Sequence, residues 1–235
     1  MDPNSEAIIR LAWTQAFGLD PSRLDVEEAG RVLHTRPEGE VLSVVRLGAQ
    51  TLVVGPAWAV QAADSLPDDD ICRVSALLQV TADHGGRALG EAALAYTDDY
   101  ISEPDLESAV VTDDEQAVLD LERACPPDDV TEVGLTELTA RFVLLGPGDA
   151  PLAGAGFDLW SGIIAQMGVL TARDSRRSGH GHRIAALATN AALDEGLIPQ
   201  WRIPVDHDSA GAMAAGLGYQ TLGHEAVVLL GDPLR

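Results

Sequence analysis

The residues best suited to chemistry lie between positions 173 and 183, where four of the fifteen cationic residues of the chain fall within eleven positions. They follow an apolar stretch from Ile163 to Thr171 that predicts a strand, and they lead into a predicted helix from Gly181 to Glu195. A helix N-terminus offers unpaired backbone N–H groups and a positive dipole end, and arginine adds forked donors. Gly179 and Gly181 allow positive φ and a close approach of phosphate to the backbone. The segment therefore predicts a seat for a polyanion.

The composition limits the classes of protein to which the chain can belong. It has 235 residues, 46% of them hydrophobic, which predicts a folded globular protein. The net charge is −22 and lysine is absent, so nucleic acid and anionic membranes are poor partners, whereas a protonated amine is a favourable one. Cys72 and Cys125 form no disulfide framework and no metal-ligand spacing. Because the sequence shows no apolar run of roughly 18 residues and no secretory pattern, we expect a cytoplasmic protein without membrane association.

The remaining segments predict the elements that must position this loop. Residues 40–55 predict a hairpin, and residues 138–171 predict a meander of short strands that ends at the loop. Residues 84–107 and 128–137 are expected to be irregular. After the loop and its helix, the pattern predicts a strand at 198–205, a short helix at 209–215 and a closing strand at 224–231.

The loop also carries a recognisable motif. Arg176 to Gly181, with the sequence Arg-Arg-Ser-Gly-His-Gly, fits the pattern Arg/Gln-x-x-Gly-x-Gly/Ala, and a helix, a strand, Ala210 and Leu217-Gly218-Tyr219 follow in matching order. In these features the chain resembles the GCN5-related N-acetyltransferase (GNAT) superfamily over residues 130–235. The resemblance implies an α/β (α+β) fold in which helices flank a mixed, mostly antiparallel central sheet. It also implies a GNAT acetyltransferase domain at 126–235, preceded by a region at 1–125 that is either an accessory unit or a degenerate GNAT-like unit.

The resemblance implies binding roles for particular residues. In the superfamily the loop binds the pyrophosphate of acetyl-coenzyme A (acetyl-CoA), the preceding strand binds the pantetheine arm through its backbone, and a later segment faces the far side of the cofactor. Transferred to this sequence, the cofactor-binding residues are Val169, Leu170, Thr171, Arg176, Arg177, Ser178, Gly179, His180, Gly181, His207 and Ala210. Two positions depart from the pattern: His207 replaces a frequent asparagine, and Ala214 replaces the tyrosine that many members use as general acid.

The chemistry of amine acylation requires a base, because an amine is mostly protonated at neutral pH. Four side chains are candidates by type and position: Glu132, Asp158, Asp206 and His224. We select Glu132 and Asp158 as candidate catalytic residues, with a plain solvent-facing position as the competing interpretation for each. Asp206 is expected to cap the helix that follows it.

The resemblance thus implies an acetyl-CoA-dependent N-acetyltransferase that acts on a primary amine of a small molecule or peptide by direct attack on the thioester. A catalytically inactive GNAT-like module that binds CoA or a protein partner is the alternative, since the usual tyrosine is missing. Acetyl-CoA is the expected co-substrate. No metal is expected, because His180 and His182 lack a nearby third ligand. We leave a homodimer open.

Overall fold

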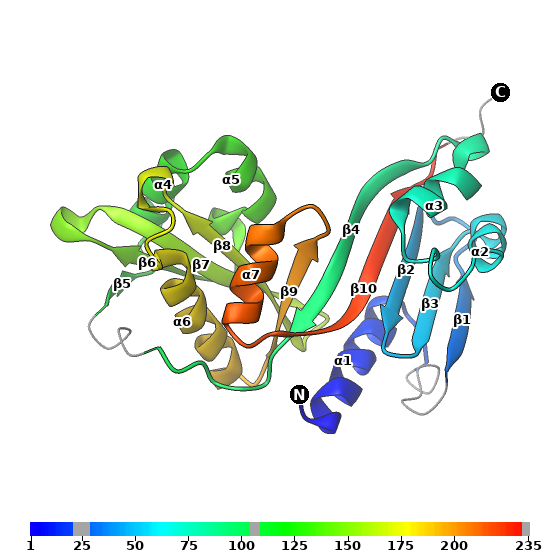
Figure 1. Ribbon diagram of the computed structural model, residues 1–235, viewed down its shortest axis with the longest axis horizontal. Helices are drawn as coiled ribbons and strands as arrows, with labels where there is room; N and C mark the ends of the chain where they lie inside the picture. The colour runs from blue at the N-terminus through cyan, green and yellow to red at the C-terminus, as the bar shows by residue number, and fades with distance from the viewer. Residues whose placement is uncertain (21–28, 104–108, 232–235) are drawn as a thin grey trace. The chain divides into compact units, whose positions relative to one another are not determined.

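The structure, a computed structural model, describes residues 1–20, 29–103 and 109–231, which form seven α-helices and ten strands (Figure 1). The chain divides into two compact units. Unit 1 comprises Met1–Ser5, Tyr96–Trp201 and Ala212–Gln220; unit 2 comprises Glu6–Ala95, Arg202–Gly211 and Thr221–Arg235. The boundary predicted between residues 125 and 126 falls within unit 1, and each unit takes segments from both sides of it. The roles assigned to the regions 1–125 and 126–235 stay predictions.

Unit 2 is built on strands in the order β1-β3-β2-β10-β4. Their bounds are β1 Gly30–Thr35, β2 Val41–Leu47, β3 Gln50–Gly55, β4 Arg87–Tyr96 and β10 Gln220–Leu229. Strand β2 pairs antiparallel with β3 and with β10, whereas β1 pairs parallel with β3. The hairpin predicted at 40–55 is confirmed as β2 and β3, joined where Gly48 adopts a φ of 61°.

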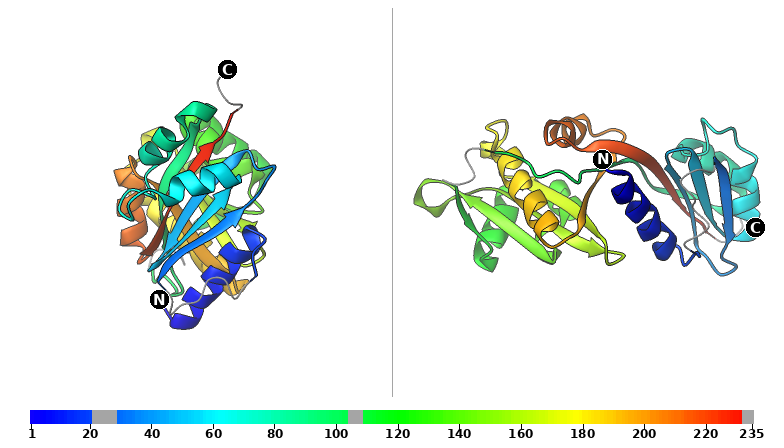
Figure 2. Two further views of the ribbon diagram at one scale, coloured as in Figure 1. Left: turned by 90° about the vertical axis from the view of Figure 1, so that its right-hand side faces the viewer. Right: turned by 90° about the horizontal axis from the view of Figure 1, so that it is seen from below.

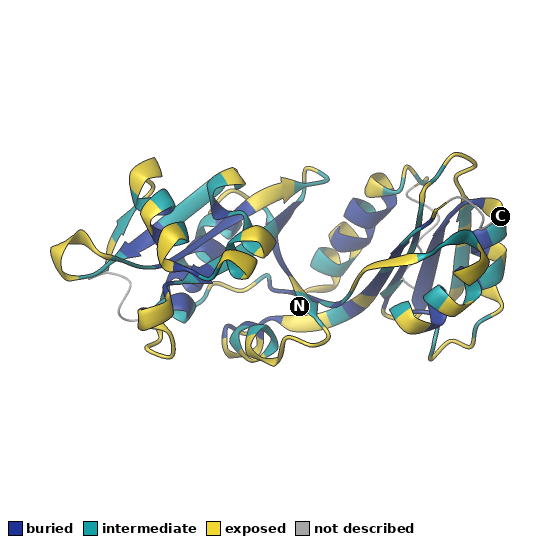
Figure 3. Cartoon of the chain, turned by 90° about the horizontal axis from the view of Figure 1, so that it is seen from above, coloured by how far each residue is buried: buried dark blue, intermediate teal, exposed yellow. Residues whose placement is uncertain are grey.

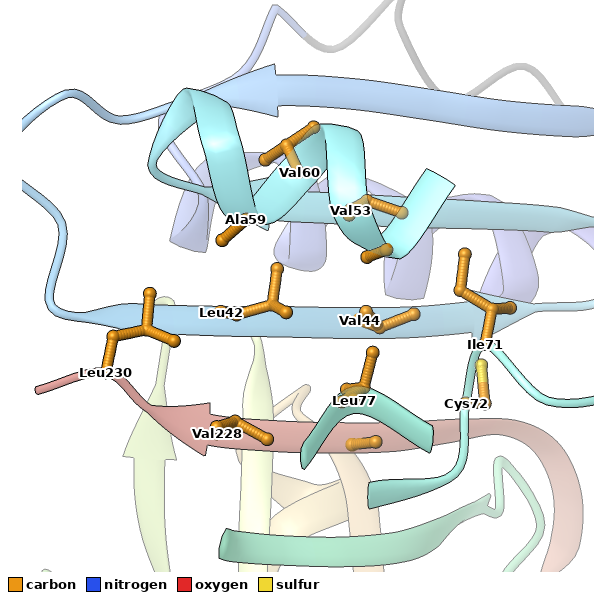
Figure 4. Close-up of a cluster of buried hydrophobic side chains, with 12 residues drawn as sticks. Leu42, Val44, Val53, Ala59, Val60, Ile71, Cys72, Leu77, Val228 and Leu230 are labelled. Carbon is orange, nitrogen blue, oxygen red and sulfur yellow. The ribbon is translucent and has the colours of Figure 1, made fainter. Parts of the chain in front are cut away.

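One face of the unit 2 sheet carries a compact apolar core (Figure 4). Helices α2 (Ala57–Asp64) and α3 (Val74–Val80) supply Ala59, Val60 and Leu77, which pack with side chains of β2, β3 and β10. A 3₁₀ turn at Ala82–His84 follows α3, and the N-terminal helix α1 is Pro3–Ala16. This core explains why residues 41–80 fold together, since neither helix is long enough to be stable alone.

The prediction of an irregular segment at 84–107 is wrong for its first part, because β4 occupies Arg87–Tyr96. The strand was hidden by its composition: Arg87 to Gly90 are all exposed, and alternation of buried and partly exposed residues starts only at Glu91. Residues 97–103 have no regular structure, and residues 104–107 lie outside the described residues. Strand β4 forms because neighbouring strands supply its hydrogen bonds, since it lies between β10 and β9 (Ile198–Pro204) in the sheet. Just beyond β9, the Val205 N–H donates to the Glu91 carbonyl at 3.2 Å.

A buried carboxylate lies on β10 of unit 2. Glu225 is only 7% exposed, and burial raises the pKa of its carboxyl group, while the ion pair with Arg202 acts in the opposite direction. A carboxyl whose pKa is raised on folding binds protons more tightly in the native state, so it lowers stability as pH rises through that raised pKa. Arg202 therefore limits the cost of keeping Glu225 charged at neutral pH.

Replacing Arg202 with methionine is expected to lower the free energy of unfolding at pH 7 by about 1–3 kcal/mol, because a buried carboxylate then lacks its cation. The loss should shrink as pH falls toward 5, since protonation of Glu225 removes the buried charge. Chemical denaturation at pH 5, 6 and 7 measures this. Arg73→Met, which removes an exposed arginine paired with Asp70, is the matched control. A loss of equal size at all three pH values would contradict the explanation.

Unit 1 is built on strands in the order β9-β8-β7-β6-β5. Their bounds are β5 Val110–Thr112, β6 Ala140–Leu145, β7 Pro151–Trp160, β8 Ile164–Thr171 and β9 Ile198–Pro204, the last of which ends in unit 2. Strands β6 to β8 form an antiparallel meander, as predicted for 138–171. Strand β5 pairs antiparallel with β6, and β8 pairs parallel with β9. The fold class is therefore confirmed: a mixed, mostly antiparallel sheet flanked by helices.

Helices cover both faces of the unit 1 sheet (Figure 2). The helices are α4 (Glu115–Ala124), α5 (Pro127–Val133) and α6 (His180–Asp194), with 3₁₀ turns at Leu135–Glu137, Pro147–Asp149 and Arg173–Ser175. Helix α7 (Asp208–Gly216) begins in unit 2 and ends in unit 1. Leu170 packs with Val118 and Leu121 of α4, whereas the adjacent Thr171 lies beneath the start of α6. Because successive strand residues face opposite sides, α4 and α6 lie on opposite faces of the sheet.

Glycines on β7 and β8 let α4, α5 and the following turn approach the sheet closely. A Cβ at Gly154 would lie 2.6 Å from methyl groups of Leu121 and Leu135, and one at Gly168 would lie 2.9 Å from Val133. The central strands are correspondingly the most buried part of the unit, in dark blue in Figure 3. The irregular structure predicted at 128–137 is wrong, since α5 and a 3₁₀ turn form there around the left-handed Gly134.

Candidate functional site

The basic loop connects the end of β8 to the start of α6, entirely within unit 1. Gly179 precedes the helix with a φ of 80°, and Arg177 adopts a φ of 61°, an uncommon value for a residue with a side chain. The first hydrogen bond of the helix runs from the Arg183 N–H to the Gly179 carbonyl at 3.0 Å. The backbone N–H groups before Arg183 in this first turn therefore have no acceptor within the helix. That turn contains no acidic residue. The geometry is that of an anion seat.

A glycine is required at position 181 because of the packing around it, and not because of its own backbone conformation. A Cβ at this position would lie 2.7 Å from Thr171 Oγ1 and 3.3 Å from Met213 Cε. The glycine therefore lets the first turn of α6 lie directly on the end of β8. Gly179 differs, since a Cβ there would meet nothing within 4 Å and only its positive φ disfavours a side chain. The two glycines of the motif thus serve separate structural purposes.

The loop arginines differ in their surroundings. Arg176 forms an ion pair with Asp129 of α5, and its Nε lies 3.5 Å from the Thr171 carbonyl. Arg177 is exposed, as is Ser178, whose hydroxyl donates to the Arg176 carbonyl at 3.5 Å. An exposed ion pair contributes little to stability, so a bound anion can compete with Asp129 for the Arg176 guanidinium.

His180 is the first residue of α6 and is partly buried. Its Nδ1 is enclosed, and among the residues that the structure describes it has no hydrogen-bond partner. His182, two positions on, lies 3.3 Å from the Glu103 carboxylate through its own Nδ1. Within the described ranges, no group of three or more histidine, cysteine or acidic side chains gathers as metal ligands would. The absence of a metal stays an expectation.

Val169, Leu170 and Thr171 form the end of β8, where the sheet changes its pairing. All of β8 pairs with β7, but the parallel ladder with β9 joins Ile164–Gln166 to Ile198–Gln200 and ends there, whereas β8 continues to Thr171. Alternate residues of a strand direct their N–H and C=O groups toward the same neighbour. Half of the backbone groups between Met167 and Thr171 therefore face away from β7, along an edge that leads to the basic loop.

The later binding residues lie in the other unit. His207 and Ala210 belong to unit 2, at the start of α7, where Ala210 N–H donates to the His207 carbonyl at 3.1 Å. Their cofactor contacts stay predictions. Ala214, at the position of the absent tyrosine, is buried, and nearby Tyr219 shares a 2.8 Å hydrogen bond with Thr189. Tyr219 is 7% exposed and burial raises the pKa of its phenol, so this side chain belongs to the core.

Glu132 and Asp158 both have exposed side chains. Glu132 lies on α5 rather than in a loop, and Asp158 lies on β7, where it accepts a hydrogen bond from Thr139. Their catalytic roles stay predictions. Asp206 and His224 are exposed residues of unit 2.

Sequence reasoning missed three residues near the site: Asp129, Gln166 and Gln200. Asp129 fell in a segment predicted to be irregular, and it is the partner of Arg176. The two glutamines are 34 positions apart, so no local pattern signals that their side chains meet at 2.6 Å.

The unit 1 loop and strand edge fit a thioester of coenzyme A. The start of α6 offers backbone N–H groups to a pyrophosphate, Arg176 and Arg177 supply charge, and the edge of β8 offers amide groups to an extended pantetheine arm. Gly181 holds the helix against the strand so that these two surfaces adjoin. Within the described residues, none of the helices combines the length and the apolar character required to cross a membrane.

Comparison with known proteins gives matches among solved structures. No family model matches the sequence, and no curated protein matches it. A GCN5-related N-acetyltransferase from Kribbella flavida is 20% identical over 68% of this chain, with a TM-score of 0.49. A GCN5-related N-acetyltransferase-like protein from Streptococcus suis is 16% identical over 80% of this chain and 83% of its own, with a TM-score of 0.47. A Drosophila protein is 16% identical over 67% of this chain, with a TM-score of 0.50.

These likenesses concern the fold. The chain spans 64% of the Kribbella structure and 56% of the Drosophila structure, less than two thirds of either. The element order in unit 1 agrees with the expectation from the motif: an antiparallel meander leads into the Arg-x-x-Gly-x-Gly loop, a helix and a parallel strand. The chain therefore has a GNAT-like fold, in which the Arg-x-x-Gly-x-Gly loop lies between β8 and α6.

Proposed function

We propose that the chain is an acetyl-CoA-dependent N-acetyltransferase of the GNAT superfamily that acts on a primary amine of a small molecule or peptide. One observation carries the proposal: the basic loop, the open first turn of α6 and the edge of β8 adjoin within a single unit. The net charge of −22 supports a cationic acceptor, because a negative surface attracts protonated amines.

Acetyl-CoA supplies an acyl carbon activated as a thioester: the amine nitrogen forms the new C–N bond, the C–S bond breaks, and the thiolate leaves. The loop and the β8 edge hold and orient this substrate, which is a large part of the catalysis that such a reaction needs. The ammonium form of the acceptor loses one proton to a base before it attacks, for which Glu132 and Asp158 remain the candidates, and the nitrogen loses a second proton as the amide forms. The thiolate gains one proton through water, since Tyr219 is sequestered in the core, and the other proton is released to solvent.

A second function, a non-catalytic module that binds CoA, is favoured by one specific observation. Ala214 is buried in place of the superfamily tyrosine, so that the chain lacks the usual acid at that position. Both functions require the loop to bind the cofactor, but only the first predicts that acetyl-CoA is turned over. Release of free thiol from acetyl-CoA in the presence of primary amines distinguishes them.

The proposal is tested by calorimetric titration with acetyl-CoA. We expect micromolar binding that the double variant Arg176→Ala/Gly179→Ala weakens by at least about tenfold, equivalent to about 1.4 kcal/mol. The matched control is Arg123→Ala/Gly196→Ala, which removes another exposed arginine of unit 1 and another glycine with positive φ (74°) and open surroundings. Absence of acetyl-CoA binding to the wild-type chain would refute the proposal, and an equal loss in the control would refute the role of the loop.

A further inference from the structure

Two glutamines meet where the β8–β9 ladder ends. Gln166 and Gln200 are the last pair of that ladder, and the Gln200 Nε2 donates to the Gln166 Oε1 at 2.6 Å. The Gln200 side chain is almost fully enclosed, at 2% exposure for the residue. Beyond this pair, β8 continues as an open edge toward the basic loop. The amide pair therefore marks the closed end of the strand edge to which we assign the pantetheine arm.

The Gln200 carbonyl is unsatisfied. Among the residues that the structure describes, the Oε1 of Gln200 has no hydrogen-bond partner, although the atom is buried. A buried polar atom without a partner is uncommon in native proteins, because its desolvation is not offset, and it requires an explanation. A carbonyl oxygen can only accept, so the missing partner is an N–H or O–H donor.

The amide pair lies on the face of the sheet opposite to the anion loop. Gln166 alternates with Gly168 and Leu170 along β8, and Leu170 packs against α4, whereas the loop leads into α6 on the other face. Paired residues of neighbouring strands share a face, so Gln200 lies on the α4 side as well.

We propose that the Gln200 Oε1 accepts a hydrogen bond from the N–H of the acceptor amine, which makes Gln200 a specificity-determining residue for primary amines. This inference rests on the proposed function. The Gln200 amide orients the nitrogen without taking its proton, because an amide oxygen is not a base at neutral pH. Gln166 is a positioning residue: its carbonyl holds the Gln200 amide group, which leaves the other end of that amide free for the acceptor.

The test compares three variants. Gln200→Met removes both polar ends at similar size. Gln200→Glu keeps an oxygen acceptor, and Gln166 can turn its amide to donate to it. Gln50→Met is the matched control, because Gln50 is also buried and its Oε1 also lacks a partner among the described residues, but it lies on β3 of unit 2. Each variant is measured by acetyl-CoA calorimetry, by thermal unfolding, and by thiol release with n-butylamine, spermidine, glucosamine and a lysine-containing peptide.

We expect Gln200→Met to bind acetyl-CoA within twofold of the wild-type affinity, and to raise the KM of the best amine at least about tenfold while kcat changes less. Its Tm should be similar or slightly lower, since the variant removes an unsatisfied atom but also leaves the Gln166 Oε1 without its Gln200 donor. Gln200→Glu should keep the amine KM within about threefold, and Gln50→Met should leave the KM unchanged.

Several outcomes would overturn the inference. An unchanged amine KM in Gln200→Met would do so, as would a parallel loss of acetyl-CoA affinity, which would assign the pair to the cofactor seat or to the fold. A wild-type chain that binds acetyl-CoA but acetylates none of the four amines would also overturn it, while leaving the cofactor seat intact. A wild-type chain that binds no acetyl-CoA would instead remove the proposed function itself.

Discussion

Replacing Gly181 with alanine is expected to weaken acetyl-CoA binding by at least about thirtyfold, equivalent to about 2 kcal/mol. The new Cβ would lie 2.7 Å from Thr171 Oγ1 on the strand beneath, with Met213 Cε at 3.3 Å on another side. The first turn of α6 must then move off β8, which displaces the N–H groups of the anion seat relative to the strand edge. Calorimetric titration of the variant with acetyl-CoA measures the effect.

Gly211→Ala is the matched control for this substitution. Gly211 is also a helical glycine, on α7, but a Cβ there would meet only Ile203 Cγ2 at an ordinary 3.7 Å. The control should bind acetyl-CoA normally and should be slightly more stable, because alanine is the better helix former. If Gly181→Ala and Gly211→Ala bound acetyl-CoA equally well, the close packing of α6 on β8 would not be what builds the seat.

Replacing Gly156 with alanine is expected to destabilise unit 1 by about 3 kcal/mol or more. Gly156 lies in the middle of β7, and a Cβ there would clash with the backbone carbonyl of Ala140 and lie 3.0 Å from Arg141 Cα on β6. Backbone atoms of a paired strand cannot rotate aside as a side chain can, so the β6–β7 ladder must distort. Denaturant unfolding followed by circular dichroism reports the loss.

Gly90→Ala provides the comparison, because Gly90 is also a strand residue but a Cβ there would meet nothing within 4 Å. This control should be neutral or slightly stabilising, since alanine restricts the unfolded chain more than glycine does. If Gly156→Ala were as stable as Gly90→Ala, the two strands would have to separate without cost. That result would contradict the expectation from the close packing of the sheet.

The anion seat shows how an acidic chain can present a site for an acidic ligand. Arg176 is paired with Asp129, so that an acidic side chain partly offsets the local positive charge. The N–H groups at the start of α6 are not subject to such pairing, because no acidic residue occupies that turn. Backbone donors and the helix dipole therefore carry a share of the attraction that a more basic protein would obtain from lysine.

The sequence by itself determined those features that depend on neighbours in the chain. The strand ending at Thr171, the positive φ of Gly179 and the helix from His180 were predictable, since they follow from local alternation, glycine chemistry and helix periodicity. The hairpin at 41–55 was predictable for the same reason. Motif spacing also indicated the GNAT-like fold, although it left the catalytic base undecided.

The tertiary structure decided what depends on residues far apart in the chain. Strand β4 was missed because it takes its hydrogen bonds from strands more than a hundred residues later, and helix α5 was missed because packing against β8, rather than its own weak periodicity, holds it. Gln166 and Gln200 carry no signal in the sequence, since a glutamine acquires an unsatisfied carbonyl only when two strands bury it. Local chemistry determined the basic loop and the first turn of α6, whereas long-range pairing decided which side chains meet at the end of the strand edge.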